Sequence, residues 1–512
     1  MSFMNAVRQT LDNEYNVSIT ENGAVGYRTT GKELLDLNFA VASLRKMPDA
    51  EVAKRFKKAF CEDQVLAMKW LFYARDVRGG LGERRLFRVV LADLVKSNPE
   101  MVIPVMNLIP EYGRYDDLWC LLDDKEAANV IYQIVDNQLK SDWENMAAKK
   151  PISILAKWMP SINASSVKTK EYGKKLCKAL KMTEREYRKA LSKLRKYLDV
   201  VEVKMSDKNW SEIKYEAVPS RANLIYNSAF LRNDEARRRE YLGKLEKGET
   251  KINASTLFPH DIVHKYCNGS RYMKSKDTAI EAMWKALPDT VKGCGNTIVV
   301  ADGSGSMTCT VDNNSRVTAL EVANALAIYF AEHSSGDFKD KYITFSHRPQ
   351  LVDFSKCKNL HDKLQTALAH NEVADTNIEK VFDLILTTAI NGGMSQEDMP
   401  KNILIISDME FNSCARCDSG GYGSRPTQRL FDVIAKKYAR AGYKMPRLVF
   451  WNVNSRTGTI PVKENELGVA LVSGFSVNVA KMIMSGKTDP FECLLETLNS
   501  ERYAPVEEAL NQ

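Results

Sequence analysis

Residues 297–306 read Thr-Ile-Val-Val-Ala-Asp-Gly-Ser-Gly-Ser, and this stretch decides the fold of the second half of the chain. The apolar run Thr297–Ala301 predicts a strand that is buried on both faces, as in a parallel sheet. Further strands are expected at 342–345, 403–407 and 448–451, and helices at 317–333, 376–388 and 427–441. This alternation predicts a doubly wound α/β domain, whose ligands bind beyond the carboxyl ends of the strands.

Oxygen-bearing side chains stand where these predicted elements end or begin. Asp302, Ser304 and Ser306 follow the first strand, Asp408 follows the strand at 403–407, and Thr376 opens a helix. Carboxylates and hydroxyls are hard ligands that suit Mg²⁺ or another divalent cation. The sequence therefore predicts a metal site built from these five residues.

The charge of the chain is unevenly spread over its 512 residues. The net charge is +8, yet residues 1–290 carry 50 Lys and Arg against 39 Asp and Glu, whereas residues 291–512 carry 23 against 26. This split predicts two domains with different tasks, 1–290 and 291–512. The basic excess is strongest at 166–198, with twelve basic and three acidic residues, and such a segment attracts polyanions such as nucleic acid.

The first domain shows helical periodicity. From Thr30 to about Pro288, apolar residues recur at spacings of three and four, and the breaks carry turn residues such as Gly79–Gly82. This pattern predicts an all-α array of HEAT-like stacked helices, although no strict sequence period is present. The arginine-rich stretch 75–85 lacks the pattern of a nucleotide-binding loop, so we interpret it as an elbow between two helices.

One helix of this array can be read residue by residue. Thr183 and Glu186 form a capping box, and an apolar stripe follows at Tyr187, Leu191, Leu194 and Leu198. The opposite face carries a cationic ridge, which we expect to contact phosphates or, alternatively, only to keep the face solvated. The ridge comprises Arg185, Arg188, Lys189, Lys193 and Lys196.

The remaining candidate phosphate contacts lie outside this helix. They are Arg75, Arg78, Arg84, Arg85, Lys174 and Lys175. Three nearby tyrosines could stack on unpaired bases, but packing in the core is the favoured interpretation. They are Tyr172, Tyr187 and Tyr197.

No pattern in the chain predicts an enzyme. His260 and His264 lie one helical turn apart, which resembles part of a zinc-protease motif, but no third ligand can be named. Cys414 and Cys417 form the one close cysteine pair, and loop cysteines are favoured over a half metal site. The longest apolar stretch, Met101–Pro110, is far short of the ~20 residues that cross a bilayer. With no secretory signal at the start, we expect a soluble, cytoplasmic protein.

The metal-site residues resemble the metal-ion-dependent adhesion site of von Willebrand factor A domains. In that family the two serines and the threonine contact the metal, and the aspartates act directly or through water. The resemblance implies that Ser304, Ser306 and Thr376 are direct ligands and that Asp302 and Asp408 support them. It also implies a protein partner that completes the metal shell with a carboxylate. The sequence departs from the family in having Ala374-Asp375, where glycine usually precedes the threonine.

A basic helical half followed by a von Willebrand factor A domain resembles the Ro autoantigen family and its Ro-like relatives. The matching stretches are 73–87, 110–119, 187–195, 218–220 and 258–263. The resemblance implies a TROVE module, a ring of helical repeats, that binds small structured or misfolded RNA as a ribonucleoprotein. The alternative is a metal-dependent protein-interaction scaffold that binds no RNA.

Overall fold

The chain forms two compact units, each assembled from separate stretches of sequence. The computed structural model describes residues 3–4, 7–8, 11, 15–269, 273–291, 296–345, 348–371, 377–411, 430–461, 469–480 and 489–511. The α/β unit comprises Met1–Glu62 and Leu257–Leu498, and the helical unit comprises Asp63–Thr256 and Asn499–Gln512. The compact units therefore do not divide at residue 290, where the charge and periodicity placed the boundary.

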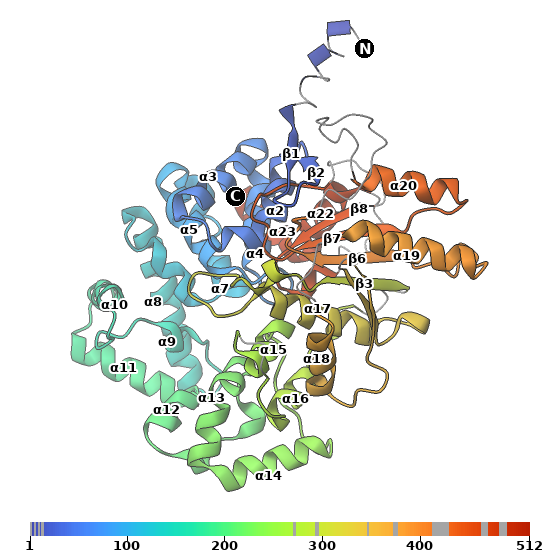
Figure 1. Ribbon diagram of the computed structural model, residues 1–512. Coiled ribbons are helices and arrows are strands. Elements are labelled where there is room, and N and C mark those ends of the chain that lie inside the picture. Colours follow the sequence, from blue (N-terminus) through green and yellow to red (C-terminus); the bar gives the residue numbers. More distant parts are fainter. Residues whose placement is uncertain are drawn as a thin grey trace. The chain divides into compact units, whose positions relative to one another are not determined.

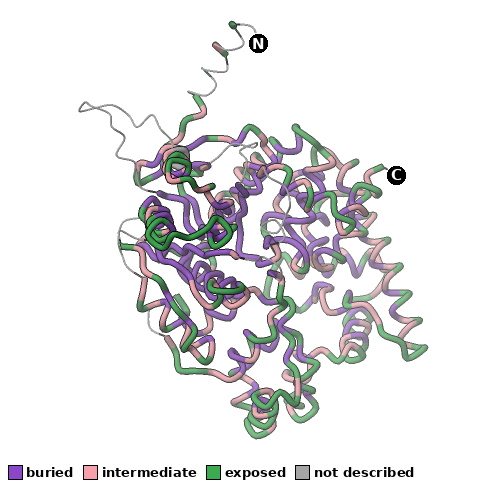
Figure 2. Tube along the Cα trace, turned by 90° about the vertical axis from the view of Figure 1, so that its right-hand side faces the viewer, coloured by how far each residue is buried: buried purple, intermediate pink, exposed green. Residues whose placement is uncertain are grey.

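The α/β unit is built on a six-stranded sheet with the order β5-β4-β3-β6-β7-β8 (Figure 1). All neighbours are parallel except β4 and β5, which are antiparallel. Every residue of β3 and β8 is buried, as are five of the six residues in β6 and in β7, so both faces of the sheet are covered. Figure 2 shows this buried centre of the unit. The strands are β3 (Thr297–Asp302), β4 (Lys341–Phe345), β5 (Leu351–Asp353), β6 (Asn402–Ser407), β7 (Arg447–Asn452) and β8 (Val469–Ser473).

Helices from both ends of the chain cover this sheet. The predicted α/β architecture is confirmed, and the helices expected at 317–333, 376–388 and 427–441 are found as α17, α19 and α20. Strands β5 and β8 were not predicted. The helices of the unit are α2 (Glu33–Leu44), α3 (Asp49–Glu62), α15 (Pro259–Cys267), α16 (Thr278–Lys285), α17 (Ala319–His333), α18 (Leu360–Ala369), α19 (Ile378–Asn391), α20 (Leu430–Arg440) and α22 (Pro490–Leu498).

The first 62 residues belong to the α/β unit because they are bonded to the sheet and its loops. Asn452, the last residue of β7, donates from its side chain to the Phe39 carbonyl of α2 at 2.8 Å. The Ser473 hydroxyl oxygen of β8 accepts from the Ala42 amide at 3.0 Å. The hairpin β1 (Val17–Ile19) and β2 (Val25–Tyr27) adds a bridge to Ile460. Helical periodicity shows that a face is buried but does not identify its partner, so the sequence alone assigned this segment to the helical array.

The helical unit confirms the predicted array of stacked helices. Its helices vary from four to twenty-three residues, in agreement with the absence of a strict sequence period. Within the described residues, no helix is both long and apolar enough to span a membrane. The helices are α4 (Gln64–Arg75), α5 (Arg84–Ser97), α6 (Pro99–Val102), α7 (Ile109–Tyr112), α8 (Lys125–Ala147), α9 (Leu155–Trp158), α10 (Val167–Ala179), α11 (Glu184–Tyr197), α12 (Val201–Ser206), α13 (Ser220–Asn233), α14 (Glu235–Glu246) and α23 (Ala504–Leu510).

The predicted elbow at 75–85 joins α4 to α5. Its turn is tight, because a Cβ atom on Gly80 would lie 1.9 Å from the Tyr73 carbonyl oxygen. Asp76, which is fully buried, accepts hydrogen bonds from Arg502 Nη2 at 2.9 Å and from the Tyr503 hydroxyl at 3.2 Å. Arg502 Nε donates to the same carboxylate. The elbow thus ties the last segment of the chain to the helical unit.

We expect Asp76→Asn to lower the free energy of unfolding of the helical unit by about 2 kcal/mol, because Arg502 loses the partner of its charge while solvent screens the exposed third of its side chain. Urea unfolding of the full chain, followed by circular dichroism, measures this change. Glu235→Gln is the matched control, since Glu235 pairs with Arg239 on the surface, where an ion pair contributes about 0.5 kcal/mol or less. Equal effects of the two substitutions would show that Asp76 does not anchor the C-terminal segment.

Candidate metal centre and basic helical surface

The predicted metal residues that the structure describes meet at one edge of the sheet. Asp302 is the last residue of β3, and Asp408 directly follows β6. These two strands are parallel neighbours in register at Ala301 and Ile406, so their carboxyl ends lie side by side. Ser304 and Ser306 belong to the turn that follows β3. Thr376, the fifth predicted ligand, lies outside the described residues.

Short contacts organise this edge. The Asp302 carboxylate accepts from the Ser304 amide at 2.9 Å and from the Ser407 hydroxyl at 2.7 Å. The hydroxyl oxygens of Ser304 and Ser306 are 3.0 Å apart. Ser407 was not among the predicted residues, although it directly precedes Asp408. The result is a turn that presents two adjacent hydroxyls beside two carboxylates.

The two carboxylates are energetically unfavourable as they stand. Burial, and next the charge of Asp408, raise the pKa of Asp302 to about 7. Burial also raises the pKa of Asp408. Oδ2 of Asp408 is buried and forms an ion pair with the Arg456 guanidinium at 3.2 Å. Two hydroxyls and two buried carboxylates with raised pKa values form a donor set that fits a hard divalent cation.

Arg456 partly neutralises this pair, a role that no sequence pattern predicted. Its guanidinium Nη1 lies 3.2 Å from Asp408 Oδ2, and its Nη2 donates to Glu21. The neighbouring Glu410 is fully buried and accepts the amides of Glu21, Arg456 and Thr457 at 2.8–2.9 Å. The N-terminal segment and the loop after β7 therefore converge on the metal-site edge.

Other metal clusters are not found in the described part of the chain. There, no group of three or more His, Cys, Asp or Glu side chains could hold an ion. His264 Nδ1 pairs with Glu321 at 2.9 Å, whereas His260 is buried and contacts the Phe475 ring. Because these two histidines have different partners, the pair does not form a zinc site. Cys414 and Cys417 lie outside the described residues.

In the absence of metal, we expect stability to fall as the pH rises. The pKa of Asp302 in the folded protein is above its ordinary value of 3.8, so the folded state binds this proton more tightly than the unfolded state does. The resulting stabilisation is complete below the ordinary pKa and is lost as the pH rises through about 7. Thermal unfolding of the full chain in EDTA, from about pH 5 to pH 8, tests this expectation.

The substitution Asp302→Asn isolates the part of the pH dependence that comes from Asp302, because an amide has the size of a carboxylate but does not bind a proton in this pH range. The variant should lose less stability than the wild type over the same pH range. If both proteins lose the same amount, the falling stability comes from other groups.

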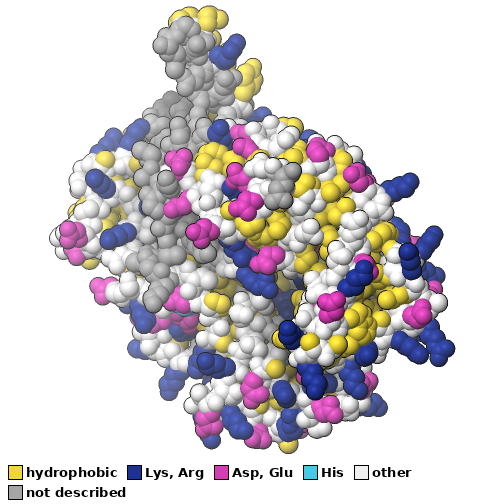
Figure 3. Space-filling model, turned by 180° about the vertical axis from the view of Figure 1, so that it is seen from behind, with side chains coloured by type: hydrophobic (Ala, Val, Ile, Leu, Met, Phe, Trp, Pro, Cys, Tyr) yellow, Lys and Arg dark blue, Asp and Glu magenta, His cyan; other side chains and the backbone are white. Residues whose placement is uncertain are grey.

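The basic ridge of α11 has the predicted geometry. Thr183 and Glu186 form the capping box, with the Thr183 amide donating to Glu186 at 2.8 Å. Tyr187, Leu191 and Leu194 are buried, while Leu198 is half-buried. All five ridge cations, Arg185, Arg188, Lys189, Lys193 and Lys196, are exposed. Figure 3 shows Lys and Arg side chains projecting from the helical unit.

Among the described residues, no ridge cation forms an ion pair with a carboxylate, in contrast to exposed cations on other helices of the unit. Lys140, Arg239 and Lys244 each pair with an acidic residue one turn away, at 2.6–2.8 Å. The ridge is therefore a run of uncompensated positive charge. Lys174 on α10 is also exposed.

The other predicted phosphate contacts differ in accessibility. Arg75 is only 4% exposed and pairs with Asp117 at 2.7 Å, so its assignment as a phosphate contact was wrong. Arg78, Arg84 and Arg85 are exposed. Lys175 is half-buried and pairs with Asp123 at 2.8 Å.

The three tyrosines mostly follow the favoured interpretation of core packing. Tyr172 and Tyr187 are buried. Tyr197 is exposed, and its hydroxyl donates to the Lys150 carbonyl at 2.8 Å. Base stacking by Tyr187 is therefore excluded in this conformation.

Comparison with known proteins gives two family matches. Residues 20–111 and 128–297 match a family described as Domain of unknown function (DUF2828). Residues 296–507 match Domain of unknown function (DUF7788). A viral relative, Uncharacterized protein L728 of Acanthamoeba polyphaga mimivirus, is 30% identical over 540 residues, covering 96% of this chain and 89% of the relative. Among solved structures, the chain is similar to the Ro (RSR) protein of Deinococcus radiodurans, with a TM-score of 0.43, 13% identity, and coverage of 87% of this chain and 93% of that one.

Proposed function

The chain belongs to the DUF2828 family. From the sequence motifs and the basic ridge of α11, we propose that it is a non-enzymatic RNA-binding protein of the Ro type. The basic ridge of α11 holds the phosphates of small structured or misfolded RNA. The α/β unit holds Mg²⁺, or another divalent cation, at Asp302, Ser304, Ser306, Thr376 and Asp408. The bound cation would accept a carboxylate oxygen from a protein partner.

The observation that carries the RNA proposal is the uncompensated charge of the ridge. A helix that needs cations only for solubility gains stability when acidic residues lie one turn away, as they do at Lys140, Arg239 and Lys244. None of the five ridge cations forms an ion pair with a carboxylate among the described residues, although Glu184 and Glu186 lie about one turn before Arg188 and Lys189, and exposed cations along about four turns repel one another unless an anion is bound. The regular spacing of phosphates along RNA supplies that anion.

An electrophoretic shift assay with a structured RNA across a range of salt concentrations tests this proposal. We expect binding at low salt, with an affinity that falls as salt displaces the protein from the phosphates. No binding at low salt, or binding that does not respond to salt, would contradict the proposal.

The second candidate function is a protein-interaction scaffold, and the buried pair Asp302 and Asp408 favours it. A carboxylate pair with raised pKa values is costly to maintain, so it fits a site that is completed by a cation and a partner. Suppose that the wild type captures a protein partner from cell extract, with no RNA in the complex. Release of this partner by EDTA, together with failure of Asp302→Ala to capture it, would support this function. Equal capture by the wild type and Asp302→Ala would count against it.

A further inference from the structure

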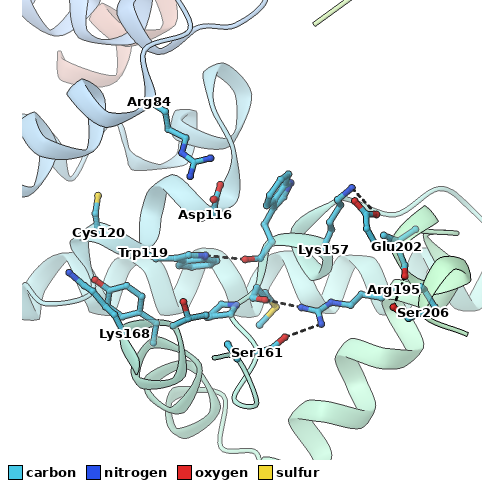
Figure 4. A pocket seen from close by; sticks show the side chains of 18 of the residues that line it. Arg84, Asp116, Trp119, Cys120, Lys157, Ser161, Lys168, Arg195, Glu202 and Ser206 are labelled. Carbon is cyan, nitrogen blue, oxygen red and sulfur yellow. Dashed lines mark hydrogen bonds and ion pairs between the residues drawn. The ribbon is translucent and has the colours of Figure 1, made fainter. Parts of the chain in front are cut away.

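A pocket of about 960 Å³ opens in the helical unit among α5, the short helix Tyr115–Leu121, α9, α10, α11 and α12. Its size lies in the range of small-molecule sites in proteins. Aromatic rings and basic groups line it together, among them Trp119, Trp158, Tyr172, Arg84 and Lys168. Figure 4 shows Arg84 pointing toward Asp116 at one end of the pocket and Glu202 with Ser206 at the other. No residue of the proposed metal site lies in this unit.

The wall of the pocket is held in place by buried polar contacts. The Arg195 guanidinium donates to the carbonyls of Ala156 and Met159 at 2.8 and 2.9 Å, and to the Ser161 hydroxyl at 3.1 Å. Trp119 Nε1 donates to the Trp158 carbonyl at 3.1 Å. The segment that carries Trp158 is thereby fixed before any ligand arrives, which reduces the entropic cost of binding.

Positive charge is in excess beside this pocket. Arg75 and Arg88 pair with Asp117, and Arg88 and Arg114 pair with Asp116, at 2.6–2.9 Å. Arg84 is the fourth arginine of this cluster, and it forms no ion pair within the described residues. Four arginines thus share two carboxylates. Burial, and next the charges of Arg88 and Arg114, lower the pKa of Arg84, and the nearby carboxylates of Asp116 and Asp117 only partly offset this effect.

Aromatic rings form the second distinctive part of the pocket lining. The Arg114 guanidinium lies 3.9 Å from the centre of the Trp158 ring, which fixes this indole by a cation–π contact. Trp158 Nε1 is buried and donates to no described residue, so this donor is left unsatisfied beside the pocket. Trp158 is the half-buried ring of this group, because Trp119 and Tyr172 are only 6% and 8% exposed. An indole beside cations is a combination that holds bases in single-stranded nucleic acid.

A second cavity in the same unit, of about 670 Å³, lacks these features. Neutral polar and aliphatic side chains dominate its lining, and Glu111 is the one charged residue among those that line it. The combination of rings and unpaired positive charge is thus particular to the larger pocket.

We propose that this pocket binds a nucleoside phosphate, either free or as the terminal nucleotide of an RNA strand. The base lies against the aromatic wall and the phosphate lies near Arg84. This inference deepens the proposed function, because a pocket for a terminal nucleotide would select RNA by its ends in addition to its backbone.

Titration of the full chain with adenosine monophosphate, followed by calorimetry, tests the pocket without any RNA. We expect the wild type to bind adenosine monophosphate more tightly than adenosine, and Arg84→Gln to weaken the binding of the monophosphate about tenfold or more. Arg84 is exposed at the start of α5, so this variant should fold normally, which circular dichroism verifies. Arg239→Gln is the control, because Arg239 is also exposed but lies outside the pocket. Absence of binding to the wild type, or equal binding by Arg84→Gln, would overturn the inference.

Two further measurements separate the source of the ligand from the proposed function. Binding of short RNA strands, with and without a terminal phosphate, is compared between the wild type and Arg84→Gln. If the pocket binds RNA ends, Arg84→Gln weakens strand binding. If it binds only free nucleotides, strand binding does not depend on Arg84. Neutralising Arg185, Lys189 and Lys193 should weaken binding to structured RNA and leave adenosine monophosphate binding unchanged. If RNA binds but the monophosphate does not, the pocket inference fails alone. If the monophosphate binds and RNA does not, the proposed function fails alone.

Discussion

Neutralising three ridge cations on α11, in the triple variant Arg185→Gln, Lys189→Gln, Lys193→Gln, should weaken binding to a structured RNA on the order of 100-fold at about 0.1 M salt. Each phosphate contact releases close to one counterion, so three lost contacts reduce the slope of log affinity against log salt by about two to three. The three residues are exposed, and none forms an ion pair with a described carboxylate, so the substitutions should leave the fold intact. Filter binding across several salt concentrations measures both quantities.

A triple variant with the same change in net charge provides the control. Lys140→Gln, Arg239→Gln and Lys244→Gln neutralise exposed cations of the same unit, but each of these already has an acidic partner. The control should therefore keep most of the affinity and nearly the full salt slope. Equal losses in the two triple variants would mean that RNA responds only to the overall charge, and that the ridge is not a binding surface.

Magnesium should stabilise the α/β unit against heat. At a Mg²⁺ concentration about 100 times the Kd, binding to the folded state alone contributes about 2.7 kcal/mol, which raises the Tm of a unit of this size by roughly 5 °C. A bound dication would offset the burial and the mutual repulsion of Asp302 and Asp408, which together raise the pKa of Asp302, and this relief would account for much of the gain. Thermal unfolding of the full chain with Mg²⁺ and with EDTA measures the shift.

The substitution Asp302→Asn makes this prediction specific, because it should abolish the stabilisation by Mg²⁺ and leave the EDTA-treated protein at least as stable as the wild type near neutral pH. Asp337→Asn, at an exposed carboxylate of the same unit, is the control and should keep the full response to Mg²⁺. Retention of the Mg²⁺ shift in Asp302→Asn would exclude the site at the end of β3 as its source.

Local patterns were enough to predict the main parts of both units. The buried apolar run at β3 predicted a strand of a parallel sheet. Because β3 and β6 are parallel neighbours, their carboxyl ends bring Asp302 and Asp408 together. The periodicity of α11 predicted which face is buried and which carries the ridge, because side chains three and four residues apart share a helix face.

Long-range pairing could not be predicted in the same way. Arg75 looked like a free cation within an arginine-rich stretch, but its partner, Asp117, lies 42 residues later. Arg456 reaches Asp408 from the loop after β7, and α2 packs on the sheet from the other end of the sequence. Such contacts depend on tertiary arrangement, and no local spacing encodes them.

Ultraviolet crosslinking of the protein in its native cell, followed by sequencing of the attached RNA and mass spectrometry of the attached peptides, tests the central claim most directly. RNA binding by the helical unit predicts small RNAs recovered above the unirradiated control, with crosslinked peptides from α10 and α11. Recovery of no RNA above that control, or crosslinks confined to the α/β unit, would contradict it.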